Sequence, residues 1–200
     1  PIVMQFHTTD MPIENSSRVN DYLTPVGTSP PYDADLEDIL QWWAQKITGL
    51  AEDLVRPRWQ PIPPRQPEAD ITWCALGIVQ VSTSGTPQII HEGTDITDPE
   101  NGADILIKHE RIEVMASFYG PLSQQYCDML KDGCQMPQNN DQLKPYNMAL
   151  LFADEIRSIP TFRNTQWLKR YDVRLYLSRK TSRIYQVRNL ASASFEIKKD

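Results

Sequence analysis

Apolar side chains recur with helical spacing between Asp33 and Leu54, and this pattern predicts the clearest helix of the chain. Several carboxylates close to Asp33 suit the positive end of the helix dipole. The apolar stripe consists of Leu36, Ile39, Leu40, Trp43, Ile47, Leu50 and Leu54. A second helix is predicted from Pro121 to Gln135, since proline is favoured at the first helical position. Its expected buried residues are Leu122, Tyr126, Met129 and Leu130.

Other stretches have the patterns of strands. Residues 71–81 are apolar at nearly every position, as in a central strand that is buried on both faces. From Arg111 to Gly120 apolar and polar side chains alternate, so this strand should bury one face only. The expected inner face consists of Ile112, Val114, Ala116 and Phe118. Residues 147–156 are expected to form a further strand.

The segments between these elements are expected to be irregular, and the C-terminal region is expected to be a hairpin. Four prolines in residues 56–64 exclude a helix and favour an extended segment, either a recognition ligand or a rigid connector across the sheet. Residues 82–104 fit a projecting loop or hairpin tip, and residues 160–167 a loop. The hairpin would have Tyr171, Val173, Leu175 and Leu177 on the inner face of its first strand, a turn at residues 180–182 and a return strand over residues 184–190.

The order of these elements predicts an α+β fold, a mostly antiparallel mixed sheet with two helices packed on one face. Residues 33–200 are expected to form a single domain, because the chain is long enough for one sizeable core. Residues 1–32 hold five prolines and no apolar periodicity, so we expect an extended arm or a disordered tail. The sequence has no apolar run long enough to span a membrane and no signal-peptide features. We therefore expect synthesis in the cytoplasm of the host cell and no membrane partner.

Charge divides the chain into an acidic and a basic region. Residues 1–155 hold 9 Lys/Arg against 23 Asp/Glu, a net charge of −14, whereas residues 156–200 hold 11 against 3, a net charge of +8. This asymmetry indicates either a nucleic-acid surface or copies of the chain that dock head to tail, although two separately solvated faces would have the same composition.

We find no catalytic, cofactor-binding or metal-binding motif. His91 and His109 lie near Glu92, Asp95, Asp98 and Asp104, but their spacing matches no standard set of metal ligands. Cys74, Cys127 and Cys134 are expected to be reduced and at least partly buried. Glu110 and Glu113 should lie on opposite faces of their strand, which excludes a carboxylate pair. The sequence therefore predicts neither an enzyme nor a cofactor.

The basic hairpin is the strongest candidate for an interaction surface. Its basic residues alternate with apolar positions, so several should project from one exposed face, which Tyr176 would share. They are Arg170, Arg174, Lys180, Arg183 and Arg188. A sheet of this kind could bind nucleic acid, but the aromatic pattern of RNA-binding sheets is missing and the acidic region would repel a phosphate backbone. A nucleic-acid-associated protein remains the alternative to a structural protein.

Five short motifs occur in an order that resembles the neck or tail-terminator proteins of contractile-tailed bacteriophages. They are residues 54–60 (LVRPRWQ) with Pro63 and Pro64; residues 72–75 (TWCA); residues 117–121 (SFYGP); residues 156–160 (IRSIP); and Trp167 with Arg170 and Asp172. The resemblance covers residues 36–190 and leaves the N-terminal arm unexplained.

The resemblance implies a structural virion protein of the phage neck without catalytic activity. Tail terminators form hexameric rings that cap the tail tube and present a surface to the head-completion or connector protein. A homo-hexamer is therefore expected, with tube and sheath proteins as partners and no specific nucleic acid. The candidate partner-binding residues are the five basic residues named above, with Arg56 and Trp59 of the proline-rich segment.

Overall fold

The computed structural model describes residues 22–60, 62, 64–93, 101–163 and 165–188. The chain divides into two compact units. The larger consists of residues 29–87 and 107–182, and the described part of the smaller consists of residues 22–28, 88–93, 101–106 and 183–188. In the described residues no helix is long and apolar enough to cross a membrane.

The elements follow one another as predicted for an α+β chain, although several bounds differ. The helices are α1 (Asp33–Thr48), α2 (Ser123–Gly133) and α3 (Pro137–Asp141), with 3₁₀ turns at Glu52–Leu54 and Lys144–Tyr146. The strands are β1 (Val55–Pro57), β2 (Trp73–Thr83), β3 (Gln88–Glu92), β4 (Asn101–Tyr119), β5 (Met148–Ala153), β6 (Arg157–Ser158), β7 (Thr161–Arg163), β8 (Gln166–Leu168) and β9 (Arg170–Arg188).

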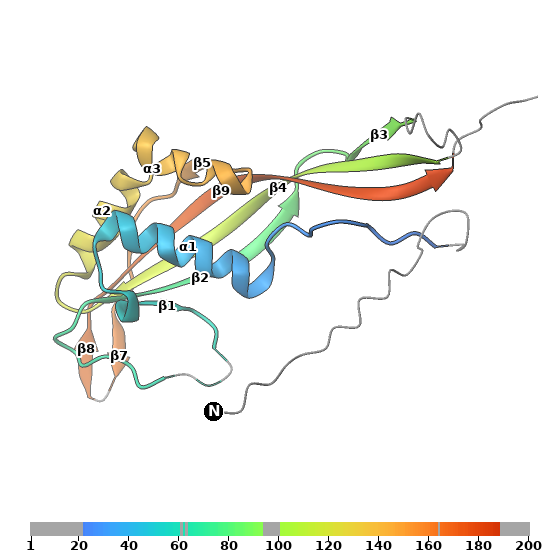
Figure 1. The fold of residues 1–200 in the computed structure, drawn as a ribbon. Helices are drawn as coiled ribbons and strands as arrows, with labels where there is room; N and C mark the ends of the chain where they lie inside the picture. The colour runs from blue at the N-terminus through green and yellow to red at the C-terminus, as the bar shows by residue number, and fades with distance from the viewer. Residues whose placement is uncertain (1–21, 61, 63, 94–100, 164, 189–200) are drawn as a thin grey trace, which may run out of the picture. The chain divides into compact units, whose positions relative to one another are not determined.

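The main sheet has the strand order β1-β2-β4-β9-β5, with β3 paired to β4 and β6 paired to β9. Strand β1 is parallel to β2, whereas the pairs β2–β4, β5–β9 and β6–β9 are antiparallel. Strands β7 and β8 form a separate antiparallel hairpin. In the larger unit α1 and α2 pack on one face of the sheet, which confirms the predicted fold class (Figure 1).

The core lies between these helices and the inner face of the sheet. The predicted inner positions of β4 and β9 are confirmed, since Ile112, Val114, Ala116 and Phe118 and likewise Val173, Leu175 and Leu177 are almost fully buried. On the helical side Leu36, Leu40 and Trp43 of α1 complete the core. The buried Trp43 donates its indole N–H to the carbonyl of Asn139 at 2.7 Å, so this polar atom is satisfied inside the core.

Both predicted helices have different limits from those expected. Helix α1 ends at Thr48 and not at Leu54, because Gly49 takes a left-handed conformation (φ 72°) that ends the helix. Helix α2 begins at Ser123, two residues later than predicted. Its buried residues are Ser123, Cys127 and Leu130, whereas the predicted Leu122 and Met129 are exposed. Small side chains at positions 123 and 127 let this face of the helix lie close to the core, which the apolar pattern alone did not indicate.

The predicted C-terminal hairpin is wrong. Residues 170–188 form the single strand β9, and residues 180–182 lie inside it. No residue among Lys180, Thr181 and Ser182 favours the positive φ of a tight hairpin turn. Instead the Lys180 amide donates to the carbonyl of Asn147 at 3.0 Å, and the buried Thr181 hydroxyl donates to the carbonyl of Lys108 at 3.4 Å. These bonds hold the segment extended.

Three segments expected to be irregular contain strands. Strand β4 begins at Asn101, ten residues before the predicted start, and β3 lies within the predicted loop over residues 82–104. The predicted loop over residues 160–167 is the β7–β8 hairpin, in which Thr165 takes a positive φ of 63° at the turn. The proline-rich segment begins as the short strand β1, so the register Val55↔Cys74 to Pro57↔Leu76 joins it to the sheet.

Strands β1 and β5, which end the main path of the sheet, have backbone amides that are bonded within local turns. In β1 the amide of Val55 donates to the carbonyl of Glu52, and Pro57 has no amide proton. In β5 the amide of Met148 donates to the carbonyl of Leu143, and the amide of Leu150 donates to the Asn140 side chain at 2.9 Å. Local turns therefore satisfy donors that an incoming strand would otherwise use.

The described part of the predicted N-terminal arm is extended. Residues 1–21 lie outside the described residues, so the choice between an arm and a tail stays a prediction. Within the smaller unit Val26 forms an isolated antiparallel bridge with Ile184, in which the Val26 amide donates to the Ile184 carbonyl at 2.8 Å. Extended backbone here can therefore pair with a strand.

Candidate interaction surface

The outer face of the sheet in the larger unit carries arginines among aromatic rings. Trp73 of β2 and Tyr119 of β4 lie opposite each other in register and stack with 4.5 Å between ring centroids. The Arg170 guanidinium lies 5.4 Å from the Tyr119 centroid and binds both carboxylate oxygens of Asp172, at 2.8 and 2.6 Å. The bonds to Asp172 raise the pKa of Arg170. The charge of this candidate residue is thus compensated within the chain.

Arg174 is also paired within the chain. Its guanidinium lies 3.0 Å from the Glu113 carboxylate, although the side chain is 44% exposed. A hydrogen bond with Tyr176 and the nearby Glu113 raise the pKa of Arg174. As predicted, Tyr176 lies on this face, where it stacks on Phe152 and is covered by Arg111 at 4.5 Å from its ring centroid. Because both Arg174 and Arg170 contact a carboxylate, neither is a ready site for phosphate.

The remaining basic candidates of β9 occupy different positions. Lys180 is exposed and forms no ion pair with any described residue. Arg183 and Arg188 belong to the smaller unit, where Arg183 is half-buried and Arg188 is exposed. Arg170, Arg174 and Lys180 therefore belong to the larger unit and Arg183 and Arg188 to the smaller one, and their role in binding a partner stays a prediction.

Arg56 and Trp59 hold the proline-rich segment in place. The Arg56 guanidinium donates to the carbonyls of Asp53 and Arg65. Farther along, Trp59 lies against Gly77 of β2, where a Cβ atom would come within 2.9 Å of the indole ring. Arg58 donates to the buried hydroxyl of Ser117 at 2.6 Å. The segment thus lies against the sheet, and Trp59 nevertheless stays 55% exposed.

A buried ion pair was not predicted. Arg179 and Glu110 are 1% and 3% exposed, and the guanidinium donates twice to one Glu110 oxygen, at 2.9 and 2.6 Å. A further bond from Arg179 to the carbonyl of Pro31 measures 2.6 Å. Burial alone would raise the pKa of Glu110, but hydrogen bonds from Lys108 and Arg179 outweigh burial and lower it. The signal in the sequence was an arginine on the apolar side of the β9 alternation.

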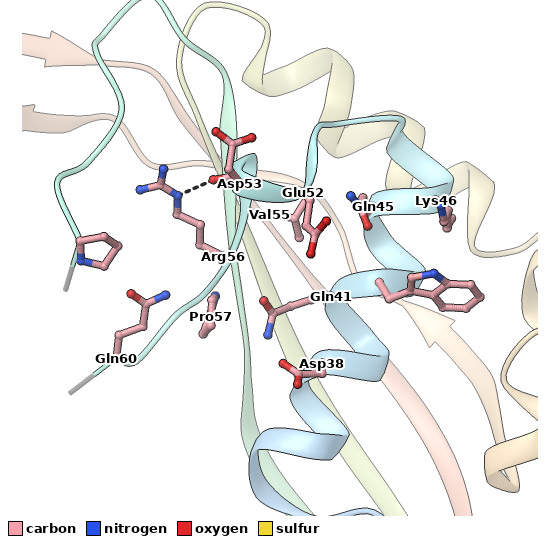
Figure 2. A pocket seen from close by; sticks show the side chains of 12 residues that line it. Asp38, Gln41, Gln45, Lys46, Glu52, Asp53, Val55, Arg56, Pro57 and Gln60 are labelled. Carbon is pink, nitrogen blue, oxygen red and sulfur yellow. Dashed lines mark hydrogen bonds between the residues drawn. The ribbon is translucent and has the colours of Figure 1, made fainter. Parts of the chain in front are cut away.

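A groove of about 750 Å³ lies between α1 and the proline-rich segment (Figure 2). Trp42, which is 42% exposed, lines it together with Val55, Pro57 and Pro64. Asp38, Glu52 and Asp53 also line the groove, and none of these carboxylates forms an ion pair within the described part of the chain. Gln41 lies on α1 facing Pro57, and its amide nitrogen is buried without a hydrogen-bond partner in the described residues.

The β7–β8 hairpin carries two exposed aromatic side chains. Phe162 and Trp167 are cross-strand partners in edge-to-face contact, with 5.3 Å between centroids, and they are 59% and 73% exposed. Arg157, Arg163 and Lys169 lie in or beside the hairpin, and none forms an ion pair with a described residue. We did not predict this surface, because alternation over three residues per strand is too short to distinguish a hairpin from a loop.

In the described part of the chain no group of three or more His, Cys, Asp or Glu residues could hold a metal ion. Cys74, Cys127 and Cys134 are free and buried, and burial raises the pKa of both Cys127 and Cys134 to about 12. Such thiols carry almost no thiolate at neutral pH. In the smaller unit His91 contacts Asp104 at 2.7 Å, while Asp95 and Asp98 lie outside the described residues. Glu110 and Glu113 contact different arginines, in agreement with opposite faces of β4.

The comparison with protein families decides the class of the protein. The family described as "Phage neck terminator protein" matches residues 34–200. This chain belongs to that family. The predicted resemblance to a phage neck or tail-terminator protein is therefore confirmed, and it extends to the end of the chain. No curated protein matches the sequence. As a neck terminator the chain is a structural protein of the phage neck, where it contacts other tail or head proteins, and its family is not one of enzymes.

Proposed function

We propose that this neck terminator forms a ring on the last ring of the tail tube, ends tube growth and joins the tail to the head-completion protein. The match to the neck terminator family over residues 34–200 carries this proposal. A homo-hexamer in a contractile-tailed phage, with sheath as well as tube proteins as neighbours, is the specific form we infer. We assign the chain no catalysis and no cofactor, in accord with three buried thiols of low reactivity.

The surface of the larger unit suits a ring of identical subunits. Such a ring needs two different patches on each copy, because each subunit meets its neighbour head to tail. The groove provides unpaired carboxylates, and the region of the β7–β8 hairpin provides unpaired basic side chains. The alternative is a protein that binds nucleic acid. It is less well supported, because Arg170 and Arg174 are already paired with carboxylates of the chain and are not free to bind phosphate.

Assembly should depend on salt. We expect association at low ionic strength and partial dissociation at high ionic strength, because exposed charges are screened beyond about 8–10 Å near physiological salt. Light scattering and electron micrographs of the purified chain, alone and with tail tubes, would measure this. A strict monomer at every salt and protein concentration, with tail tubes present as well, would exclude the ring. Salt-sensitive binding to duplex DNA without self-association would favour the alternative.

A further inference from the structure

We propose that the β7–β8 hairpin of one neck terminator chain docks into the groove between α1 and the proline-rich segment of a second copy. This inference rests on the proposed ring and names the contact that closes it. The occupant of the groove is thus another molecule of the same chain, and Phe162 and Trp167 are its anchors.

The hairpin has the properties of an unpartnered contact. A two-stranded hairpin by itself is marginally stable in water, and β7–β8 pairs with no other strand among the described residues. Its cross-strand aromatic pair is more than half exposed at both positions, and the neighbouring Ile159 is 42% exposed. Single exposed apolar side chains are common, but aromatic residues grouped on a projecting element are typical of interface anchors.

The groove has a matching composition. Its apolar lining consists of Trp42, Val55, Pro57 and Pro64, against which an aromatic ring can pack. The Gln41 amide nitrogen is buried beside the groove without an acceptor in the described residues, so a small opening of the groove would let a backbone carbonyl of an incoming hairpin reach it. A volume of about 750 Å³ lies within the range of about 300–1,000 Å³ that is usual for ligand pockets.

Charge complementarity identifies the occupant as a second copy. In the lining of the groove Asp38, Glu52 and Asp53 outnumber Lys46 and Arg56. These carboxylates form no ion pair within the described chain, and neither do Arg163 of the hairpin and the adjacent Lys169. The hairpin does not fill the groove of its own chain: its own neighbours are residues 65–69, with which it lines a different hollow. One patch of each copy is therefore complementary to the other patch of the next, which is the heterologous arrangement that closes a ring.

The size of this contact shows that it is one part of a larger interface. Two aromatic side chains bury roughly 300–500 Å² together. A stable protein interface buries about 800 Å² on each partner. The hairpin therefore acts as an anchor, and further surfaces of the ring must supply the remaining area. Reversing the charges of Arg163 and Lys169 should weaken the ring while each subunit stays folded.

Cysteine cross-linking tests which surfaces meet. The three native thiols are buried, so introduced cysteines are the accessible ones. In the double variant Gln45→Cys/Gln166→Cys, oxidation of the assembled protein, alone or on tail tubes, should produce a ladder of covalent oligomers. The control is Gln124→Cys/Gln166→Cys, because Gln124 is also a glutamine on a helix and is more exposed than the half-buried Gln45, but lies on α2 at a different hollow. The control should produce no ladder above the level of the single variants.

Charge reversal tests the energetics of the same contact. Arg163→Glu with Lys169→Glu should weaken association about tenfold or more, and so should Asp38→Lys with Asp53→Lys, whereas all four changes together should restore it. Circular dichroism would show that each variant is folded. Rings that form without the Gln45–Gln166 ladder, a disulfide within one chain, or association insensitive to both reversals would overturn the docking proposal and leave the ring intact. Absence of rings from the parent chain on tail tubes would overturn both.

Discussion

Replacing Glu110 by leucine should lower the free energy of unfolding by about 3–5 kcal/mol, because the change leaves the charge of Arg179 buried and unpaired. Arg179 is 1% exposed, so its guanidinium cannot reach water without a rearrangement of the sheet. In a domain of this size the loss corresponds to roughly 6–20 °C in the melting temperature, measured by calorimetry or circular dichroism.

The matched control is Glu113→Leu on the outer face of the same strand. Its partner Arg174 is 44% exposed and stays solvated when the carboxylate is removed, so the loss should be under about 1 kcal/mol. The double change Glu110→Leu/Arg179→Met should recover most of the lost stability, since a well-packed apolar pair can replace a buried ion pair. Equal losses of stability for Glu110→Leu and Glu113→Leu would show that the buried ion pair contributes no more to stability than the exposed one.

The same pair should make stability depend on pH in the acid range. The pKa of Glu110 is lower in the folded chain than its ordinary value of 4.5. Its contribution is therefore fully present above about pH 4.5 and is lost as the pH falls through the folded value. The difference in melting temperature between the parent chain and Glu110→Leu should shrink below that pH. A difference that stays constant down to pH 2 would contradict this account.

Replacing Gly120 by alanine should cost about 2–6 kcal/mol, for two reasons that act together. Gly120 has a φ of 102°, a conformation that residues with a side chain rarely adopt. A Cβ atom would also lie 2.5 Å from the backbone carbonyl oxygen of Ile71, which cannot move without shifting the start of β2. Thermal unfolding of the variant would measure the loss.

Gly85→Ala is the control that separates the two causes. Gly85 also has a positive φ, of 77°, but a Cβ atom there would meet nothing within 4 Å. Its replacement should therefore cost only about 1–2 kcal/mol, the penalty of the left-handed conformation. If Gly120→Ala were no more destabilising than Gly85→Ala, the close approach to Ile71 would not matter.

The sequence predicted the fold where local periodicity decides it, and failed where distant residues do. The prediction of the inner faces of β4 and β9 was correct because buried apolar positions alternate there with more polar ones. In β9 the buried positions are Val173, Leu175 and Leu177. The uninterrupted course of β9 was missed, since it depends on bonds from Lys180 and Thr181 to residues far away in the chain. The β7–β8 hairpin was missed because it rests on one turn residue, Thr165, and on strands of three residues.

For the candidate site the sequence predicts which residues are basic, and their role in binding a partner stays a prediction. Counting charges locates an excess of basic residues in the C-terminal part of the chain, but counting does not show which charges are already paired. Arg170 and Arg174 are compensated by Asp172 and Glu113, and Arg179 is buried against Glu110. The basic residues near the β7–β8 hairpin that form no ion pair in the described chain are Arg157 and Lys169, which are exposed, and the half-buried Arg163. None of them was among the predicted partner-binding residues. Pairing across strands is a property of register, which composition does not contain.

The bonded amides of β1 and β5 have a consequence for how separate chains can associate. At an unpaired strand edge further chains can add by backbone hydrogen bonding, and such addition can continue into large, stable aggregates. In β1 the amide of Val55 is already bonded and Pro57 has none, and in β5 the amides of Met148 and Leu150 are bonded to local turns. Further chains are therefore less able to add to β1 and β5 of this phage neck protein by backbone pairing.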